Sequence, residues 1–218
     1  MMRKRMTYIS ALVALAVVGT LAWTMTVRAG YESAEYKVIE TDGKIEIRQY
    51  PDLMLASTSS KIDANGNDGS FMRLFRYISG ANESDKKISM TTPVFMEDTE
   101  SNSSGTNPSG TMGFVMPKDV AAAGVPDPKA ADVTIRKRQG GRFAVIRFSG
   151  RIDSKMAEAQ ESKLRKWMES KGLVGEASAE TAGYDPPFTP GPLRRNEVLI
   201  RLSPSSGSQP SSAAVPAE

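Results

Sequence analysis

Gly183-Tyr184-Asp185-Pro186-Pro187, followed by Arg194-Arg195-Asn196-Glu197-Val198, is the most informative part of the sequence. The two prolines exclude helix and remove two backbone donors. A strand is predicted to end just before them, and a last strand to begin directly after the paired arginines. We interpret the Tyr, Asp, Arg and Glu side chains at the edges of this rigid loop as partners for its backbone groups, not as a catalytic cluster.

On the N-terminal side of this loop, alternation of apolar and polar residues predicts strands through most of the chain. Ile45 and Ile47, for example, alternate with polar neighbours, as in a half-buried strand. The expected strands cover residues 36–40, 44–50, 53–60, 94–97, 111–116, 133–138, 142–149, 177–184 and 197–202.

Two helices are predicted between these strands. Phe71, Leu74, Phe75 and Ile78 recur at helical spacing, which predicts a helix over residues 70–78 that ends near Gly80. A longer helix is expected between residues 154 and 172, with Ala157, Leu164, Trp167 and Met168 on its apolar face.

The order strand, strand, helix, strand, strand occurs twice. Ile45-Glu46-Ile47-Arg48 followed by Leu55-Ala56 resembles Val133-Thr134-Ile135-Arg136 followed by Phe143-Ala144, about 88 residues later. Two βαββ-like repeats related by a pseudo-twofold axis predict an α+β fold with sheet in the middle and a helix on either side. A closed or nearly closed sheet would protect its edges, and repeat junctions form grooves where ligands commonly bind.

Composition excludes several classes of function. The chain of 218 residues contains no His and no Cys, which rules out disulfides, thiolate metal sites, Ser-His-Asp triads and His-ligated haem. The formal net charge of +3 is due to residues 1–29, which hold Arg3, Lys4, Arg5 and Arg28 and no acidic residue. Because the rest of the chain is close to neutral, we expect no nucleic-acid partner.

The first 29 residues are predicted to be an export signal or a membrane anchor. Arg3-Lys4-Arg5 precedes an uncharged run from Met6 to Val27, and Val27-Arg28-Ala29 fits a signal-peptidase site after Ala29. The run is also long enough to cross a bilayer uncleaved. In both cases we expect the following domain to be exported, in the periplasm or outside the cell. The folded domain is expected over residues 34–202, and the Ser/Pro/Ala-rich residues 203–218 are expected to be a disordered tail.

Five segments in order resemble the SOUL / haem-binding-protein family. They are Tyr36-Lys37-Val38-Ile39 with Ile45-Glu46-Ile47-Arg48-Gln49-Tyr50, the helix from Phe71 to Gly80, Lys87-Ile88-Ser89-Met90-Thr91-Thr92-Pro93-Val94, Gly113-Phe114-Val115-Met116-Pro117, and the closing loop. The resemblance implies a distorted antiparallel eight-stranded β-barrel flanked by two α-helices. It also implies a relation to the ligand-binding domains of multidrug-sensing regulators.

What the resemblance implies for function is a groove for haem or another tetrapyrrole, here without a His axial ligand. Iron would then take Met sulfur, Tyr oxygen or Lys nitrogen, or the ligand would be held by apolar contact and by cations at its propionates. The candidate binding residues are Met54, Met72, Arg76, Tyr77, Met90, Met96, Phe114, Met116 and Lys118. Core packing and solvent exposure are the competing interpretations for each of them.

Three alternatives stay open. The pocket could hold another planar hydrophobic molecule, for example a cationic one, as in the multidrug sensors, in which case carboxylates such as Glu46 or Glu97 should point into it. The domain could instead be a protein-interaction module whose groove is filled by its own side chains. An enzyme that modifies tetrapyrroles would have to use Asp, Glu, Tyr or Lys, and for this reason we expect no enzymatic activity.

Overall fold

The structure, a computed structural model, describes residues 30–61, 68–98, 109–186 and 189–203. The predicted leader and, except for Ser203, the predicted disordered tail lie outside the described residues. Within the described ranges, no helix is long and apolar enough to span a bilayer.

The elements agree closely with the sequence prediction. The strands are β1 (Glu32–Ser33), β2 (Lys37–Asp42), β3 (Ile45–Tyr50), β4 (Leu53–Lys61), β5 (Thr91–Thr92), β6 (Val94–Asp98), β7 (Ser109–Val115), β8 (Thr134–Arg138), β9 (Gly141–Phe148), β10 (Glu180–Gly183) and β11 (Asn196–Arg201). The helices are α2 (Ser70–Ile78), α3 (Lys118–Ala123), α4 (Ser154–Ser170) and the 3₁₀ turn η1 (Gly191–Leu193).

The main sheet has nine strands in the order β2-β3-β9-β11-β10-β6-β7-β4-β8, and every neighbouring pair is antiparallel. Without β2 the order is symmetric about the β6–β10 pair. The repeat seen in the sequence is preserved in the register, because Ile47 pairs with Ala144 and the equivalent Ile135 pairs with Ala56. The two-repeat prediction is therefore correct. A short parallel ladder between β1 and β5 lies outside the main sheet.

The predicted distorted eight-stranded barrel is not formed, because the sheet does not close. The sheet stays open between β2 and β8, which do not pair among the described residues. The extra strand β2 covers one edge of the eight-stranded arrangement, and a register shift at Ile39 disrupts its own ladder. A bulged edge strand is a known way to stop further pairing without closing a sheet. The third helix, α3, was not predicted.

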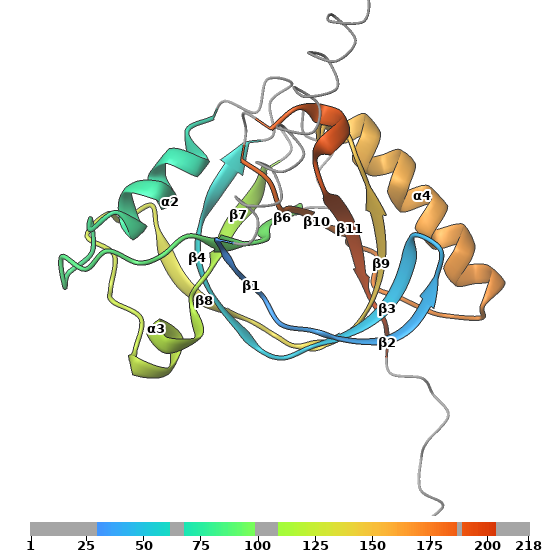
Figure 1. Ribbon diagram of the computed structural model, residues 1–218, viewed down its shortest axis with the longest axis horizontal. Coiled ribbons are helices and arrows are strands. Elements are labelled where there is room, and N and C mark those ends of the chain that lie inside the picture. Colours follow the sequence, from blue (N-terminus) through green and yellow to red (C-terminus); the bar gives the residue numbers. More distant parts are fainter. Residues whose placement is uncertain (1–29, 62–67, 99–108, 187–188, 204–218) are drawn as a thin grey trace, which may run out of the picture.

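The sheet forms a curved arch with α2 and α4 on its outer sides (Figure 1). Leu164 and Met168 of α4 pack on Ile47, Ala144 and neighbouring residues of the outer face. Under α2, Leu74, Tyr77 and Ile78 form a second cluster with Ala56 and Phe114. Phe75, expected on the buried face of α2, is 43% exposed, and Tyr77 is buried instead.

The inner face of the arch is lined by a third cluster. Tyr50, Phe95 and Phe143 fill it together with smaller apolar side chains from β4, β7, β9, β10 and β11. Tyr50 and Phe143 meet edge to face at 5.5 Å between ring centroids. The centre of the inner face is therefore packed core.

Candidate functional site

Most of the predicted binding residues are core residues under α2. Tyr77, Phe114 and Met116 are buried, with Met54 and Met90 partly buried against them. The Tyr77 hydroxyl donates to the backbone carbonyl of Pro126 at 2.7 Å, and burial raises the pKa of Tyr77 to about 12. These side chains form the core between α2 and the sheet.

Met72 and Arg76 lie on the exposed face of the same helix. Met72 is 48% exposed and Phe75 is 43% exposed, and Arg76 is one turn after Met72. Phe75 stacks on the half-buried Phe71, with ring centroids 6.2 Å apart and ring planes 13° from parallel. We call Phe71, Met72, Phe75 and Arg76 the α2 surface. It combines a thioether, aromatic faces and a cation on one helix.

The remaining two candidates are separate. Met96 lies on β6 and is only partly buried. Lys118 is the first residue of α3, exposed, and its Nζ forms an ion pair with Glu35. The structure therefore does not bring Met96 or Lys118 onto the α2 surface.

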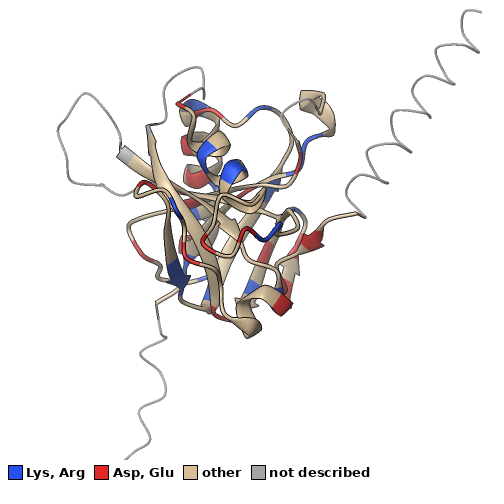
Figure 2. Ribbon diagram, turned by 90° about the vertical axis from the view of Figure 1, so that its left-hand side faces the viewer, with Lys and Arg blue, Asp and Glu red and all other residues tan. Residues whose placement is uncertain are grey.

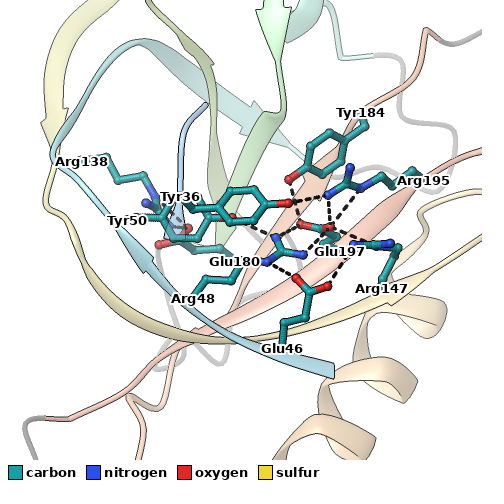
Figure 3. A network of polar contacts seen from close by, with 10 residues as sticks. All are labelled: Tyr36, Glu46, Arg48, Tyr50, Arg138, Arg147, Glu180, Tyr184, Arg195 and Glu197. Atoms are coloured by element: carbon teal, nitrogen blue, oxygen red, sulfur yellow. Dashed lines mark hydrogen bonds and ion pairs between the residues drawn. The ribbon is translucent and has the colours of Figure 1, made fainter. Parts of the chain in front are cut away.

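The conspicuous polar feature is a charge network at one end of the inner face, centred on Glu197 (Figure 3). The Glu197 carboxylate is fully buried and accepts hydrogen bonds from Arg48 at 2.7 and 3.0 Å. It also accepts from the Tyr184 hydroxyl at 2.8 Å and from Arg195 at 2.8 and 3.1 Å. Glu46 adds a second carboxylate, 2.7 Å from Arg48 Nε.

These contacts hold the network in a charged state. Burial alone would raise the pKa of Glu197, but hydrogen bonds from Arg48 and the charges of Arg48 and Arg195 lower it overall. Burial, with the charge of Glu197, raises the pKa of Tyr184 well above its ordinary value. Neither group is suited to exchange protons near neutral pH.

The side chains at the edges of the closing loop contact its backbone and one another. The backbone N–H of Arg195 donates to the Asp185 carboxylate at 2.6 Å, while the Arg195 guanidinium binds Glu197 and lies 4.0 Å from the centroid of the Tyr184 ring. Arg48 completes the network from β3 and lies 4.1 Å from the centroid of the Tyr36 ring. Sequence reasoning did not single out Arg48, although an arginine within a half-apolar strand was a visible signal.

No group of three or more acidic side chains positioned to hold a metal ion occurs within the part of the chain that the structure describes. Figure 2 shows Lys/Arg and Asp/Glu residues intermingled on the side that it presents. Met72, exposed on the α2 surface, carries a thioether of the kind that can ligate haem iron.

The fold and the inner network together define an α+β domain built from two repeats around one curved antiparallel sheet. The chain belongs to the SOUL heme-binding protein family, whose model matches residues 31–201. No curated protein matches the sequence.

Solved structures share the fold at low identity. The C-terminal domain of EcmrR is 12% identical, with a TM-score of 0.53 over 77% of this chain and 98% of that domain. A hydrolase encoded by lin2189 from Listeria innocua is 14% identical, with a TM-score of 0.54 over 76% of this chain and 94% of that one. The EcmrR–DNA complex has a TM-score of 0.55 at 11% identity, over 92% of this chain and 70% of that one.

Proposed function

We propose that the protein binds haem or a related tetrapyrrole on the α2 surface, without a His axial ligand. Family membership supports a ligand of this class. The observation that carries the location is the exposure of Met72 and Phe75 beside Arg76, above a core rich in Met and Phe. Large apolar side chains left exposed together commonly mark a binding surface.

The residues of the α2 surface have distinct roles in this proposal. The Phe75 ring offers a flat apolar face to the macrocycle, and the Met72 thioether offers a soft donor to its iron. Arg76 would pair with a propionate. Haem supplies the redox and ligand chemistry when bound, and the chain holds and orients it. The protein acts by binding and not by catalysis, in an exported or membrane-tethered form.

A haemin titration of the purified full-length chain, followed by Soret absorbance, tests the proposal. We expect a saturable one-to-one shift. Met72→Leu should alter the Soret position if the thioether reaches iron, and Arg76→Gln should weaken binding by roughly two- to fivefold, the effect of an exposed ion pair. Met156→Leu is the matched control, because Met156 is 36% exposed on α4, outside the proposed surface.

The outcomes separate the alternatives. Equal effects of Met72→Leu and Met156→Leu would exclude the thioether as a ligand. Saturable binding that survives Arg76→Gln but not Phe75→Ser would favour a different planar hydrophobic molecule. Uptake that never saturates would refute tetrapyrrole binding.

The filled inner face supports a second candidate function. Tyr50, Phe95 and Phe143 occupy the space where an enclosed ligand would lie. A protein-interaction domain that uses its outer surface has no need of an internal cavity. Failure of the haemin titration would favour this function.

A further inference from the structure

The α2 surface lies on the outer side of the curved sheet, on a helix of nine residues (Figure 1). Such a helix is about 13 Å long and presents a convex face. Two hollows, of about 620 and 270 Å³, lie beside α4 and between β6, β8, β10 and β11, and no residue of the α2 surface lines them. A planar molecule laid on α2 would therefore keep one face in water, whereas binding sites commonly bury about 70% or more of a ligand's surface.

The groups by which a protein can hold haem come in pairs. Haem has two faces, two axial positions on its iron and two propionates. The α2 surface offers one partner for each pair: the Phe75 ring for a face, the Met72 thioether for an axial position and the Arg76 guanidinium for a propionate. One chain thus supplies half of the groups that haem can engage.

Arg76 is available for this role, unlike the other arginine of the same helix. The Arg73 guanidinium donates to the Thr58 hydroxyl at 3.0 Å and to the backbone carbonyls of Asp68 and Ser59 at 3.1 and 2.6 Å. The side chain of Arg76 is exposed and has no ion pair or hydrogen bond within the ranges that the structure describes. An unpaired positive charge therefore stands beside the exposed apolar side chains of the α2 surface.

A second copy of the chain would supply the missing half through the same residues. A two-fold axis in the plane of the macrocycle, passing between the propionates, exchanges its two faces, its two axial positions and its two propionates. Identical subunits commonly pair about such an axis, each using the same surface patch. The second Met72, Phe75 and Arg76 would then engage the axial position, the face and the propionate that the first copy leaves open.

From this match we infer that a second copy of the chain completes the site, so that one haem is held between two α2 surfaces. The inference rests on the function proposed above. The pair should form only with the ligand, because two Arg76 charges repel each other when no propionates lie between them. The face of a nine-residue helix is also small beside the roughly 1,200 Å² or more that a stable protein interface buries.

Haemin titrated into an excess of the full-length chain tests this pairing. The chain is kept in a density-matched detergent, and sedimentation velocity is followed at the Soret band, so that only haem-bearing species are seen. We expect these species to have twice the protein mass of the haem-free chain. They should return to the single mass when haemin exceeds the chain, because each chain then takes a haem of its own, which gives the one-to-one end point.

The two-fold arrangement makes a specific prediction for substitutions, because each change occurs twice in the bridged complex. Arg76→Gln, expected to weaken binding to one chain by roughly two- to fivefold, should weaken the bridged complex by roughly four- to twenty-five-fold. Met72→Leu removes both thioethers and should shift the Soret band of the bridged species. Lys163→Gln, which removes an exposed cation of α4, is the charge-matched control and should leave both complexes unchanged.

The outcomes separate this inference from the proposed function. Haem-bearing species of single mass in an excess of chain would overturn the bridge and leave haem binding intact. A haem-free chain that already has the mass of the haem-bearing species would overturn it as well. Equal effects of Arg76→Gln on the two complexes would contradict the two-fold arrangement. Absence of any saturable Soret change would refute the proposed function and this inference together.

Discussion

At the scale of single residues, Glu197 has the largest consequences, because its buried charge is paired with Arg48 and Arg195, lies 3.6 Å from Arg147 and accepts a hydrogen bond from Tyr184. Glu197→Gln would leave Arg48 buried with too little negative charge around it. We expect a loss of about 3–5 kcal/mol in the free energy of unfolding at pH 7, measured by urea denaturation. Glu161→Gln, which removes an i,i+4 partner of Arg165 at the surface, should cost only about 0.5 kcal/mol or less.

The lowered pKa of Glu197 also predicts how the free energy of unfolding depends on pH. The pKa of Glu197 is lowered on folding, so its ionised form stabilises the native state above its ordinary pKa of 4.5. That contribution should disappear as the pH falls below this value towards the folded pKa. Urea titrations between pH 7 and pH 3 should show a smaller acid loss for Glu197→Gln than for the unchanged chain. An identical acid loss in both proteins would contradict the assignment.

The sequence pointed to Glu197 and Arg195 because they stand beside the closing loop, but it did not indicate Arg48. Arg48 is 149 residues before Glu197, and the two meet only because β3, β9 and β11 are neighbours in the sheet. Strand order is a property of the whole fold.

At the scale of elements, helix α4 has an N-terminal cap whose contribution to stability can be measured. The Asp153 carboxylate caps its N-terminus by accepting from the backbone N–H of Met156 at 2.7 Å. Asp153→Ala should reduce the free energy of unfolding by about 1 kcal/mol, and Asp153→Asn should retain most of it. Thermal denaturation of both variants checks this. Equal losses would indicate that the cap is not the source of the effect.

Element prediction succeeded where periodicity was long enough. The approximate extents of the strands and of α2 follow from alternation and helical spacing over many residues. Helix α3 has only six residues, and β1 and β5 only two each, so no period can be recognised in them. Met54, Tyr77 and Phe114 were recognised as apolar, but their place in the core between α2 and the sheet depends on tertiary packing.

At the scale of the whole molecule, the open sheet predicts a gradient of stability. Strand β2 lies at an edge with all six residues exposed, whereas β11, in the middle of the order, has five of its six residues buried, and its partly buried neighbour β10 is paired on both sides. Native-state hydrogen exchange should be fastest in β2 and slowest in β9, β11 and β10. Protection of β2 equal to that of β10 would mean that another surface covers this edge.

Closure of the sheet could not be inferred from the sequence. The two repeats predict eight strands, and a barrel is one way to satisfy their edges, but an added bulged strand is another. The choice depends on β2, whose polar and apolar residues do not alternate regularly. The absence of His and Cys, by contrast, limited the chemistry of the protein without any structural knowledge.

The symmetric strand order has one more consequence. Three strands of each repeat are adjacent in the sheet, namely β6, β7 and β4 in the first repeat and β10, β11 and β9 in the second. The first strand of each repeat, β3 or β8, instead pairs with the outermost of the three strands of the other repeat. The protein is thus a strand-swapped pair of half-domains within one chain, and a half expressed alone would need a second copy to complete its sheet. The two crossing links touch, since Gly140 N–H donates to Asp52 at 2.7 Å and a Cβ at position 140 would lie 2.5 Å from the Tyr50 carbonyl oxygen. Because position 140 is a glycine, the two links can cross in direct backbone contact.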